Sequence, residues 1–329
     1  MKKEWLVKTL ALGIIVLFVG AGVVSGFNVN PEDKSKPLNL GNWLYVGGTG
    51  PENYTFIQDA VNDSSNGDTI FVFSGTYYEN VVINKSIKLI GEDKNTTIIF
   101  GKKINDTIGL FTDGIFIQDF TLKHNEDIEM QVMNLLYVNS NDNIISNNIF
   151  ISKPFRRETA IKLENSFRNT ISQNIIKNNY GSGIELRNSH FNEISGNIII
   201  GLIFRKGIGV FLIDSSNNLV KRNEFRKNSC CVRLHELSNL TTNNQIIENN
   251  FLIYYIRMSG VYFYYEYHRD KGNRGNIINS NYWNRPRIFP KYILGWISLF
   301  WIPQKDYGYL VRIIIPRFDK HPAQEPYDI

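Results

Sequence analysis

The stretch Asn169–Ile200 reads NTISQNIIKNNYGSGIELRNSHFNEISGNIII and contains two copies of one short pattern. The pattern is Asn-x-Ile/Val-x-x-Asn-x-apolar, and it recurs throughout the second half of the chain. Its six copies begin at Asn143, Asn169, Asn192, Asn218, Asn244 and Asn276, at spacings of 26, 23, 26, 26 and 32 residues. Matches at so constant an interval predict a solenoid that stacks one supersecondary unit repeatedly.

The spacing within one copy predicts a bend in the chain. The apolar residues Ile171 and Ile176 are five positions apart. On one continuous strand an odd separation would place them on opposite faces. Both can point into a core only if the chain turns between them, and asparagine tolerates the left-handed backbone of such a corner better than most residues. Each copy is therefore predicted to form a strand, an asparagine-marked corner and a second strand.

A third strand is predicted upstream of each corner, because alternating apolar pairs precede three of the copies. These pairs are Ile161 and Leu163, Ile184 and Leu186, and Val210 and Leu212. Stacking such turns at the strand spacing of about 4.8 Å places like residues over like. The six repeat asparagines, among 40 asparagines in 329 residues, are then expected to form a structural ladder of side-chain amides.

The N-terminus has the order of a secretory signal. Three lysines precede an apolar run, Leu10–Phe27, and small residues allow cleavage before Gly26. Because the run is 18 residues long, it also fits an uncleaved anchor. We expect a signal peptide or anchor over residues 1–26, a secreted or cell-surface protein, and membrane association where this segment is retained.

A short capping helix is expected before the first strands. Thr55 and Gln58 have the spacing of a capping box, and Phe56, Ile57, Ala60 and Val61 would share one helical face. The strands predicted next are 69–73, 81–83 and 87–90.

The segment TFIQDAVNDSSNGDTIFVFSGTYYENVVINKSIKLIGEDKNTTII, Thr55–Ile99, together with the asparagine repeats, resembles exported proteins of the pectin-lyase-like superfamily. The resemblance is to its NosD-like or carbohydrate-binding/sugar-hydrolase group, which is common on archaeal and bacterial surfaces. It implies a single-stranded right-handed parallel β-helix over 44–283, without fixing an activity.

The chain after Trp283 departs from the repeat. Several prolines, from Pro286 to Pro326, argue against regular central strands, so an irregular C-terminal cap is expected over 284–329. The apolar run Tyr292–Ile302 would close the end of the helix or dip into a membrane interface.

Motifs of the superfamily's pectin-degrading enzymes are absent from the sequence. The chain lacks Asn-Thr-Asp, Gly-His-Gly, Arg-x-Pro-x-x-Arg and Asp-Pro-His. Glu164, Glu185 and Asp214 fall at nearly equivalent repeat positions and would line one face, either as an unrecognised catalytic site or as a polar surface. The enzyme question therefore stays open, and the sequence favours a protein without catalysis.

Copper is the one metal that the NosD-like resemblance implies. Soft donors are few: Met130 and Met133 with His124 upstream, and the adjacent pair Cys230 and Cys231. We expect the methionines to fill core gaps, and one cysteine to face the core and the other to face outward. No metal site or cofactor is predicted, and no disulfide staple is expected.

The best candidate for ligand binding is an aromatic segment inside the longest repeat interval. A strand there would place Phe263, Tyr265 and Tyr267 on one face and Tyr262 and Tyr264 on the other. One aromatic face would then stack on sugar rings, or it would pack against the C-terminal apolar run.

We therefore expect an all-β exported or cell-surface protein that binds a polysaccharide or contributes to envelope structure. The alternatives are a polysaccharide lyase, hydrolase or epimerase with an unrecognised site, and a NosD-like accessory protein for copper-site maturation. A formal net charge of +5 is too small to predict nucleic acid binding, and the sequence fixes no oligomeric state.

Overall fold

The computed structural model describes most of the chain from residue 41 onward. The described residues are 41–102, 106–124, 134–153, 158–179, 181–201, 207–237, 241–252, 259–266, 275–283, 291–303, 308–314, 317–319 and 321–329. Only the backbone is described for 178–179, 259–266, 291–303, 308–314 and 317–318. The expected signal segment 1–26, Met130, Met133 and Tyr267 lie outside the described residues.

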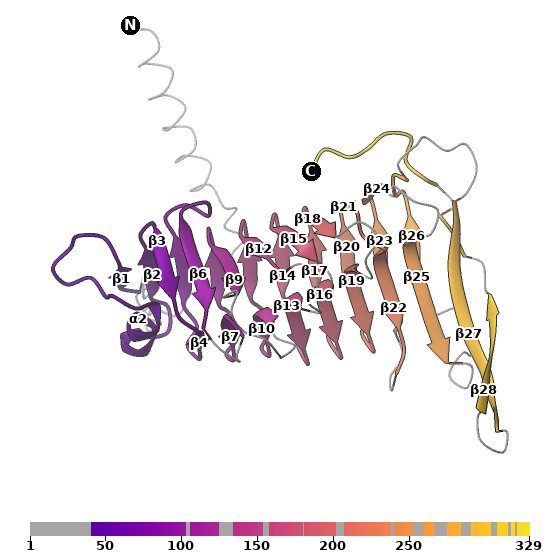
Figure 1. Ribbon diagram of the computed structural model, residues 1–329, viewed down its shortest axis with the longest axis horizontal. Coiled ribbons are helices and arrows are strands. Elements are labelled where there is room, and N and C mark those ends of the chain that lie inside the picture. The colour runs from indigo at the N-terminus through magenta and orange to yellow at the C-terminus, as the bar shows by residue number, and fades with distance from the viewer. Residues whose placement is uncertain are drawn as a thin grey trace, which may run out of the picture. The chain divides into compact units, whose positions relative to one another are not determined.

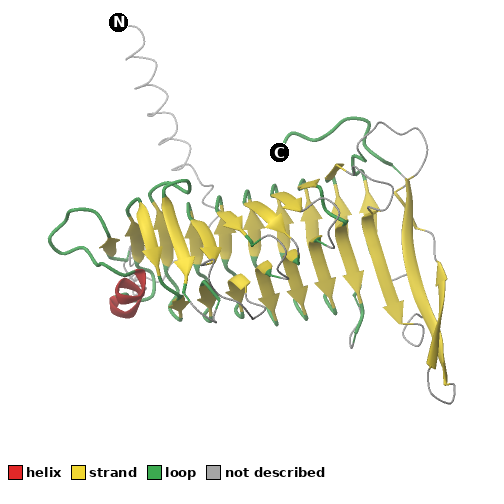
Figure 2. Ribbon diagram, in the orientation of Figure 1, coloured by secondary structure: helices red, strands yellow, loops and turns green. Residues whose placement is uncertain are grey.

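The described strands form three sheets that run along a parallel β-helix (Figures 1 and 2). Sheet A contains β1 (Trp43–Val46), β2 (Thr69–Val72), β5 (Lys88–Gly91), β8 (Phe116–Gln118), β11 (Ile144–Ser146), β14 (Thr170–Ser172), β17 (Glu193–Ser195), β20 (Leu219–Lys221), β23 (Gln245–Ile247) and β26 (Ile277–Asn279). Sheet B contains β3 (Gly75–Tyr78), β6 (Thr97–Gly101), β9 (Thr121–His124), β12 (Ile149–Ile151), β15 (Ile175–Asn179), β18 (Ile198–Gly201), β21 (Glu224–Arg226) and β24 (Asn250–Leu252). Sheet C contains β4 (Val81–Ile83), β7 (Ile108–Leu110), β10 (Asn134–Val138), β13 (Thr159–Glu164), β16 (Ser182–Arg187), β19 (Ile208–Ile213), β22 (Cys230–His235), β25 (Ser259–Glu266), β27 (Lys291–Pro303) and β28 (Gly308–Ile314). The remaining elements are α2 (Ile57–Asp63) and β29 (Arg317–Asp319).

One rung of the helix consists of a strand from sheet C, then one from sheet A and one from sheet B. About seven such rungs follow one another from β4 to β24, as the three-strand repeat predicts. Ile161 pairs in parallel with Ile184, which in turn pairs with Val210, and all three are fully buried. Burying a side chain of this size stabilises the fold by about 1.5–3 kcal/mol, so each column of like residues extends one continuous core.

Asparagine side chains join the rungs at the corner between sheets C and A. Asn192 donates from its backbone N–H and from Nδ2 to Oδ1 of Asn218, over 2.9 and 3.1 Å. The same pair of bonds links each neighbouring pair of the six repeat asparagines. Nδ2 of Asn192 also donates to the carbonyl oxygens of Ser166 and His190. Backbone N–H and C=O groups at the strand ends, which would otherwise be buried without partners, are thereby hydrogen-bonded.

The second asparagine of the pattern forms an equivalent ladder between sheets A and B. It runs through Asn148, Asn174, Asn197, Asn223, Asn249 and Asn281. A third series, of hydroxyls, lies where the chain leaves sheet C: the N–H groups of Ser166, Ser189 and Ser215 donate to the hydroxyls of Ser189, Ser215 and Thr241. The sequence analysis missed this series, although Ser or Thr stands three residues before each of these repeat asparagines.

The left-handed backbone of the corners does not lie at the ladder asparagines, so that part of the prediction is wrong. The positive φ angles belong to the residue before each ladder position, such as Phe191 at 58° and Arg222 at 52°. Residues of many types occupy these places, including Gly196 and Glu248. The ladder amide holds the corner closed, and its hydrogen bonds stabilise the strained residue that precedes it.

The N-terminal cap is built differently from the expected capping box. Thr55 does not cap the helix, whose N-cap residue Phe56 makes no side-chain capping bond and is 48% exposed. Instead, both carboxylate oxygens of the buried Glu79 accept the free N–H groups of Ile57 and Gln58, over 2.9 and 3.0 Å. A carboxylate at this position meets the positive end of the helix and replaces a local cap.

Both cysteines are buried as free thiols, so the expectation of an outward-facing cysteine is wrong. Cys231 belongs to the core, and Cys230 is only 2% exposed. The first residues of the neighbouring strands, Thr159, Ser182 and Ile208, are buried as well. Alternation therefore does not decide exposure at this corner, where the first residues of β13, β16, β19 and β22 are all buried.

The C-terminal segment is more regular than expected. β27 pairs in parallel with β25 and antiparallel with β28, so the run predicted to close the helix continues sheet C. The prolines do not prevent this, because Pro303 ends the strand and Pro290 precedes it. The second ladder ends at Asp319, which is fully buried. One of its carboxylate oxygens accepts hydrogen bonds from Asn281 N–H, Asn281 Nδ2 and Trp283 Nε1.

Helices contribute little to the described part of the chain. None of the helices found there has both the length and the apolar character that crossing a bilayer requires.

Replacing one ladder asparagine should destabilise the whole helix. In Asn197→Ala the N–H of Asn174 and the carbonyl oxygen of Ile171 lose their partners while still buried. We expect the free energy of unfolding to fall by about 2–4 kcal/mol in urea titrations. Ser195→Ala, in the same rung and partly exposed on the outer face of sheet A, is the control and should change it by less than about 0.5 kcal/mol. Equal effects of the two variants would contradict a stabilising role for the ladder.

Candidate functional site

Polar and aromatic side chains gather on the outer face of sheet C. In each long strand the inward residues are fully buried and the residues between them are partly exposed, as with Lys162 between Ile161 and Leu163. Parallel pairing aligns these outward residues from strand to strand. We call the resulting surface the sheet C face; it consists of Tyr137, Lys162, Glu164, Glu185, Arg187, Phe211, Arg233 and His235.

A carboxylate organises the first part of the sheet C face. Oε2 of Glu164 accepts from the hydroxyl of Tyr137 at 2.9 Å and from Nζ of Lys162 at 3.1 Å. Burial alone would raise the pKa of Glu164, but the hydrogen bonds from Lys162 and Tyr137 outweigh it and lower the pKa. The Lys162 ammonium also lies 5.6 Å from the centroid of the Tyr137 ring, which packs 5.9 Å from the ring of Phe111. Glu164 is therefore held ionised.

The second part of the sheet C face combines an ion pair with stacked rings. Arg187 lies 3.6 Å from Glu185, and its side chain is 41% exposed. The rings of Phe211 and His235 stack at 6.0 Å with an angle of 7° between their planes, and the Arg233 guanidinium is 5.5 Å from the Phe211 centroid. Burial, followed by the charge of Arg233, lowers the pKa of His235, so its imidazole is neutral at pH 7.

The acidic residues predicted to share a face separate in the structure. Glu164 and Glu185 occupy neighbouring strands of the sheet C face, as expected. Asp214 does not join them, because it lies buried at the corner after β19, where its Oδ1 accepts from the N–H of Leu237 at 2.7 Å. The face thus carries two carboxylates and three cations, an arrangement suited to binding hydroxyl and acidic groups.

The predicted aromatic platform lies on β25, the next strand of the same sheet. Tyr262 and Tyr264 pair in register with Arg233 and His235. Phe263 pairs with the buried Leu234. Tyr265 pairs with Ile297 of β27. The register therefore aligns Tyr262 and Tyr264 with residues of the sheet C face, and Phe263 with a core residue of β22.

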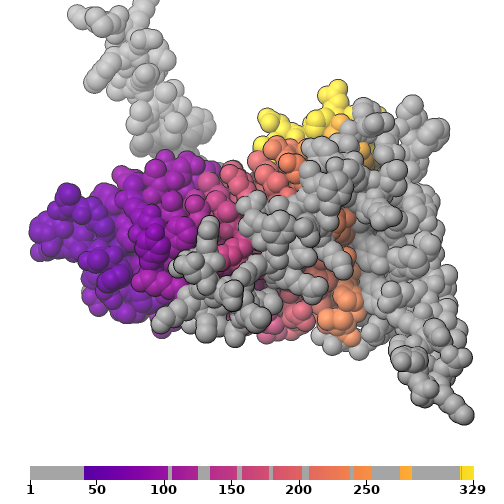
Figure 3. All heavy atoms as spheres, viewed as in Figure 1, coloured from indigo at the N-terminus to yellow at the C-terminus, as the bar shows by residue number. Residues whose placement is uncertain are grey.

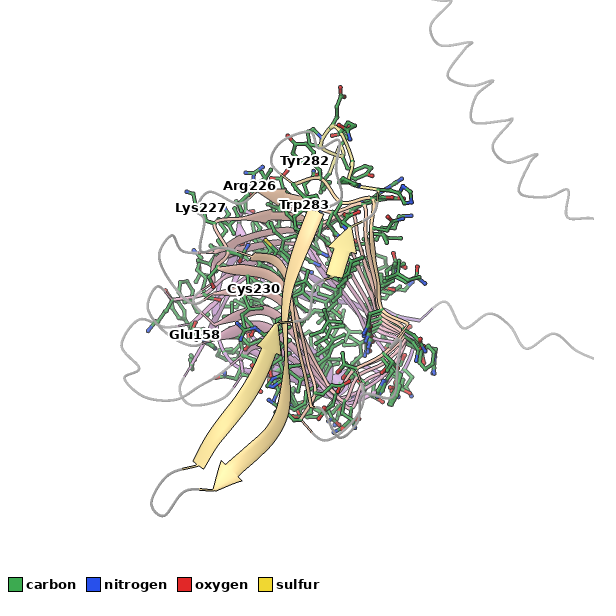
Figure 4. The ribbon with its side chains drawn as sticks, turned by 90° about the vertical axis from the view of Figure 1, so that its right-hand side faces the viewer. Glu158, Arg226, Lys227, Cys230, Tyr282 and Trp283 are labelled. Carbon is green, nitrogen blue, oxygen red and sulfur yellow. The ribbon has the colours of Figure 1, made fainter. Side chains whose placement is uncertain are left out.

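A separate buried pair provides one unpartnered nitrogen donor. His124 Nδ1 lies 3.5 Å from Oε1 of Glu158, and both side chains are more than nine-tenths buried. The other oxygen of Glu158 accepts from the N–H of Lys153, whereas Nε2 of His124 has no hydrogen-bond partner. Figure 4 shows Glu158 on the same side of the helix as Cys230, at the junction of sheets B and C. A carboxylate behind one imidazole nitrogen is the usual support of a histidine metal ligand.

This donor chemistry fits copper at a single position. No cluster of three His, Cys, Asp or Glu side chains suited to a metal ion occurs within the described ranges. The Cys231 thiol has a pKa raised well above its ordinary value by burial, which disfavours the thiolate form that binds metals. Among the predicted copper donors that the structure describes, His124 has a ring nitrogen without a hydrogen-bond partner.

Sequence reasoning missed Phe111, Arg233, His235 and Glu158. Arg233 and His235 alternate with Val232 and Leu234, so the pattern that predicts the core also marks the outward positions. Glu158 carries no such signal, because its contact with His124 joins segments 34 positions apart across an inter-rung loop.

One family of known proteins matches most of the chain. The family described as periplasmic copper-binding protein (NosD) matches residues 61–287. Similar solved structures include pectin methylesterase from carrot (TM-score 0.44, 13% identity, 73% of this chain and 83% of that chain) and pectin methylesterase PemA from Erwinia chrysanthemi (0.40, 12%, 87% and 90%). The A-module of mannuronan C-5 epimerase AlgE4 from Azotobacter vinelandii is another (0.36, 14%, 63% and 75%). Likenesses this distant carry no information on activity, and no curated protein matches the chain.

Stability should depend on pH through the histidine of the sheet C face. Folding lowers the pKa of His235, so the folded state favours the neutral imidazole. The resulting contribution to stability is present above the ordinary histidine pKa of about 6.5 and is lost as the pH falls below that value. We expect the free energy of unfolding to decrease between pH 7.5 and pH 5.5, and His235→Phe, which keeps a ring against Phe211, to reduce that decrease. His190, whose pKa burial also lowers, should retain part of the slope. Identical slopes in urea titrations of the two proteins would contradict the assignment.

Proposed function

This chain belongs to the NosD family of periplasmic copper-binding proteins, and on that premise we propose that it works outside the cytoplasm as a carbohydrate-binding β-helix. The ligand is a polysaccharide of the cell envelope or its surroundings, bound along the sheet C face without catalysis. The observation that carries this proposal is one continuous row of aromatic and charged side chains on strands β10 to β22: Tyr137, Lys162, Glu185, Phe211 and Arg233.

The periodicity of this surface supports a polymeric ligand. Successive strands present a ring or a charge at intervals of about 4.8 Å along a nearly straight sheet. A chain of sugar units offers a repeating set of hydroxyl groups and weakly polar ring faces to such a row. The ion pairs of the face are partly exposed, which leaves their remaining hydrogen-bonding capacity open to a ligand. Tyr262 and Tyr264, by their register, would extend this surface toward the C-terminus.

The state of Glu164 favours binding over catalysis. Glycoside hydrolysis requires a carboxylic acid that is still protonated near neutral pH, beside a second carboxylate. The pKa of Glu164 is lowered by Lys162 and Tyr137, and Glu185 is paired with Arg187. Both groups are therefore suited to accepting hydrogen bonds from sugar hydroxyls.

Binding can be tested with matched arginine variants of the full chain. A glycan array carrying neutral and uronic-acid polysaccharides would identify the ligand, and its affinity would then be measured by biolayer interferometry. Arg187→Ala should weaken binding by about tenfold, as expected for loss of a charge-assisted contact. Arg222→Ala is the control, because Arg222 is 59% exposed and paired with Glu248, beside sheet A.

Two outcomes would contradict the proposal. One is the absence of binding to every glycan on the array, and the other is equal weakening by both arginine variants. Release of reducing ends or unsaturated sugars from any of these polysaccharides would instead support the alternative of an enzyme.

A second candidate function is copper binding, which the family description names and which His124 supports. Its Nε2 is buried and unpartnered, and Glu158 fixes the other ring nitrogen. An imidazole whose other nitrogen is held by a carboxylate is a donor for Cu(I) as well as for divalent metals. In this role the protein would carry or deliver copper outside the cytoplasm, as an accessory protein does.

Competition for Cu(I) with bicinchoninate would test this second function. We expect the full chain to bind copper and His124→Asn to bind it at least about tenfold more weakly. His321→Asn, which changes an exposed histidine in the C-terminal tail, is the control and should bind as the unaltered protein does. Equal affinities for the three proteins would exclude His124 as a ligand.

A further inference from the structure

Exposed apolar side chains concentrate at the N-terminal end of the helix. Ten large apolar residues are exposed in the described part of the chain, and six of them lie between residues 43 and 111. These six, which we call the N-terminal collar, are Trp43 (55% exposed), Tyr45 (42%), Phe56 (48%), Tyr78 (52%), Val82 (49%) and Phe111 (49%). Figure 3 shows this end of the helix, in indigo, uncovered by other atoms in that view.

The collar comes from every side of the first rungs. β1 of sheet A supplies Trp43 and Tyr45, β3 of sheet B supplies Tyr78, and β4 of sheet C supplies Val82. Phe56 precedes α2, and Phe111 follows β7. These apolar groups lie on three sheets, from β1 to the rung of β7, and are not needed for the core, which lies inside the same strands.

The aromatic rings of the collar are ordered by their neighbours. Tyr45 stacks on Phe73 at 6.2 Å and lies 6.4 Å from Trp43, while Phe71 meets Phe73 edge to face at 5.2 Å. These side chains are already largely fixed in position. A partner that binds them therefore costs little further side-chain entropy.

We propose that the N-terminal collar seats this end of the helix in the headgroup region of a lipid bilayer. Tryptophan and tyrosine prefer that region, because one part of the ring is apolar and the other forms hydrogen bonds. Such residues surround this end of the helix on all three sheets and can meet a bilayer on every side, whereas a polysaccharide chain would contact only one side.

The length of chain before the collar places a membrane segment within reach. Fifteen residues separate the apolar run Leu10–Phe27 from Trp43. Fifteen residues span at most about 50 Å when fully extended. A bilayer that held this run would therefore be within reach of the collar, and the two attachments would reinforce each other through a high effective concentration.

The charges around the collar are of both signs, so burial of apolar side chains would drive its contact with the bilayer. Lys88, aligned with Trp43 through Thr69, is exposed, and Lys123 lies 5.5 Å from the Phe100 ring centroid. The exposed acids Glu52, Asp59 and Asp63 oppose these cations. We therefore expect seating on neutral phosphatidylcholine without any need for anionic lipid, and little sensitivity to salt.

Depth-dependent quenching tests the proposal on the full chain. Because both native thiols are buried, a bimane probe can be attached selectively to Tyr45→Cys in protein reconstituted into phosphatidylcholine vesicles. Ile277→Cys is the matched control: it is 49% exposed on sheet A, at the opposite end of the helix. Nitroxide lipids should quench the probe at position 45 at least about twofold more than the probe at 277.

The control shares the N-terminal run, so tethering alone cannot produce that difference. Equal quenching at both positions, or quenching at 45 that disappears in 1 M salt, would overturn the proposal. Protection of the probe at 45 by a soluble polysaccharide, without quenching by lipid, would assign the collar to a glycan instead. Thermal melting of both labelled proteins establishes that they are folded.

Discussion

The structure depends on satisfying backbone groups at its corners. Every rung must leave one sheet and enter the next inside a packed interior, where an unpaired N–H or C=O costs about 1–3 kcal/mol. An asparagine side chain resolves this because it both accepts and donates. Its oxygen takes two N–H donors from the preceding rung, and its Nδ2 reaches carbonyls and the following amide. Once the corners are fixed, strand register, the apolar columns and the outward rows follow.

Much of the fold could be predicted from the sequence, because repetition turns weak local preferences into a strong signal. The spacing of Ile171 and Ile176 predicts a corner, and both side chains are fully buried on either side of it. What the sequence could not provide depends on contacts between distant segments. Glu79 caps α2 across 22 positions, and Cys230 is buried at the start of its strand. Arg222 and Glu248 adopt a left-handed backbone conformation that their residue types do not predict. The neighbouring ladder asparagines stabilise this conformation.

The candidate sites illustrate the same division. The sheet C face arises from the repeat itself, since any residue between two inward residues must point outward; for this reason Glu164 and Glu185 could be anticipated. Asp214 stands one position beyond the end of its strand, and its side chain is buried at the corner, where it accepts a hydrogen bond. His124 ends β9 and Glu158 stands just before β13, in a connection between rungs where no periodicity helps. The N-terminal collar is also outside the repeat, so only the structure could gather its members.

Asp319 closes the second ladder with a group that accepts but does not donate. Each asparagine before it makes the same bonds to its neighbours, and none of those bonds depends on how many rungs lie between the two ends. A duplication or deletion of one segment of 23 or 26 residues within the repeat would thus leave both termini chemically unchanged. The length of this molecule is a discrete variable, open to evolution by whole units, and the binding surface on sheet C would lengthen or shorten in step with it.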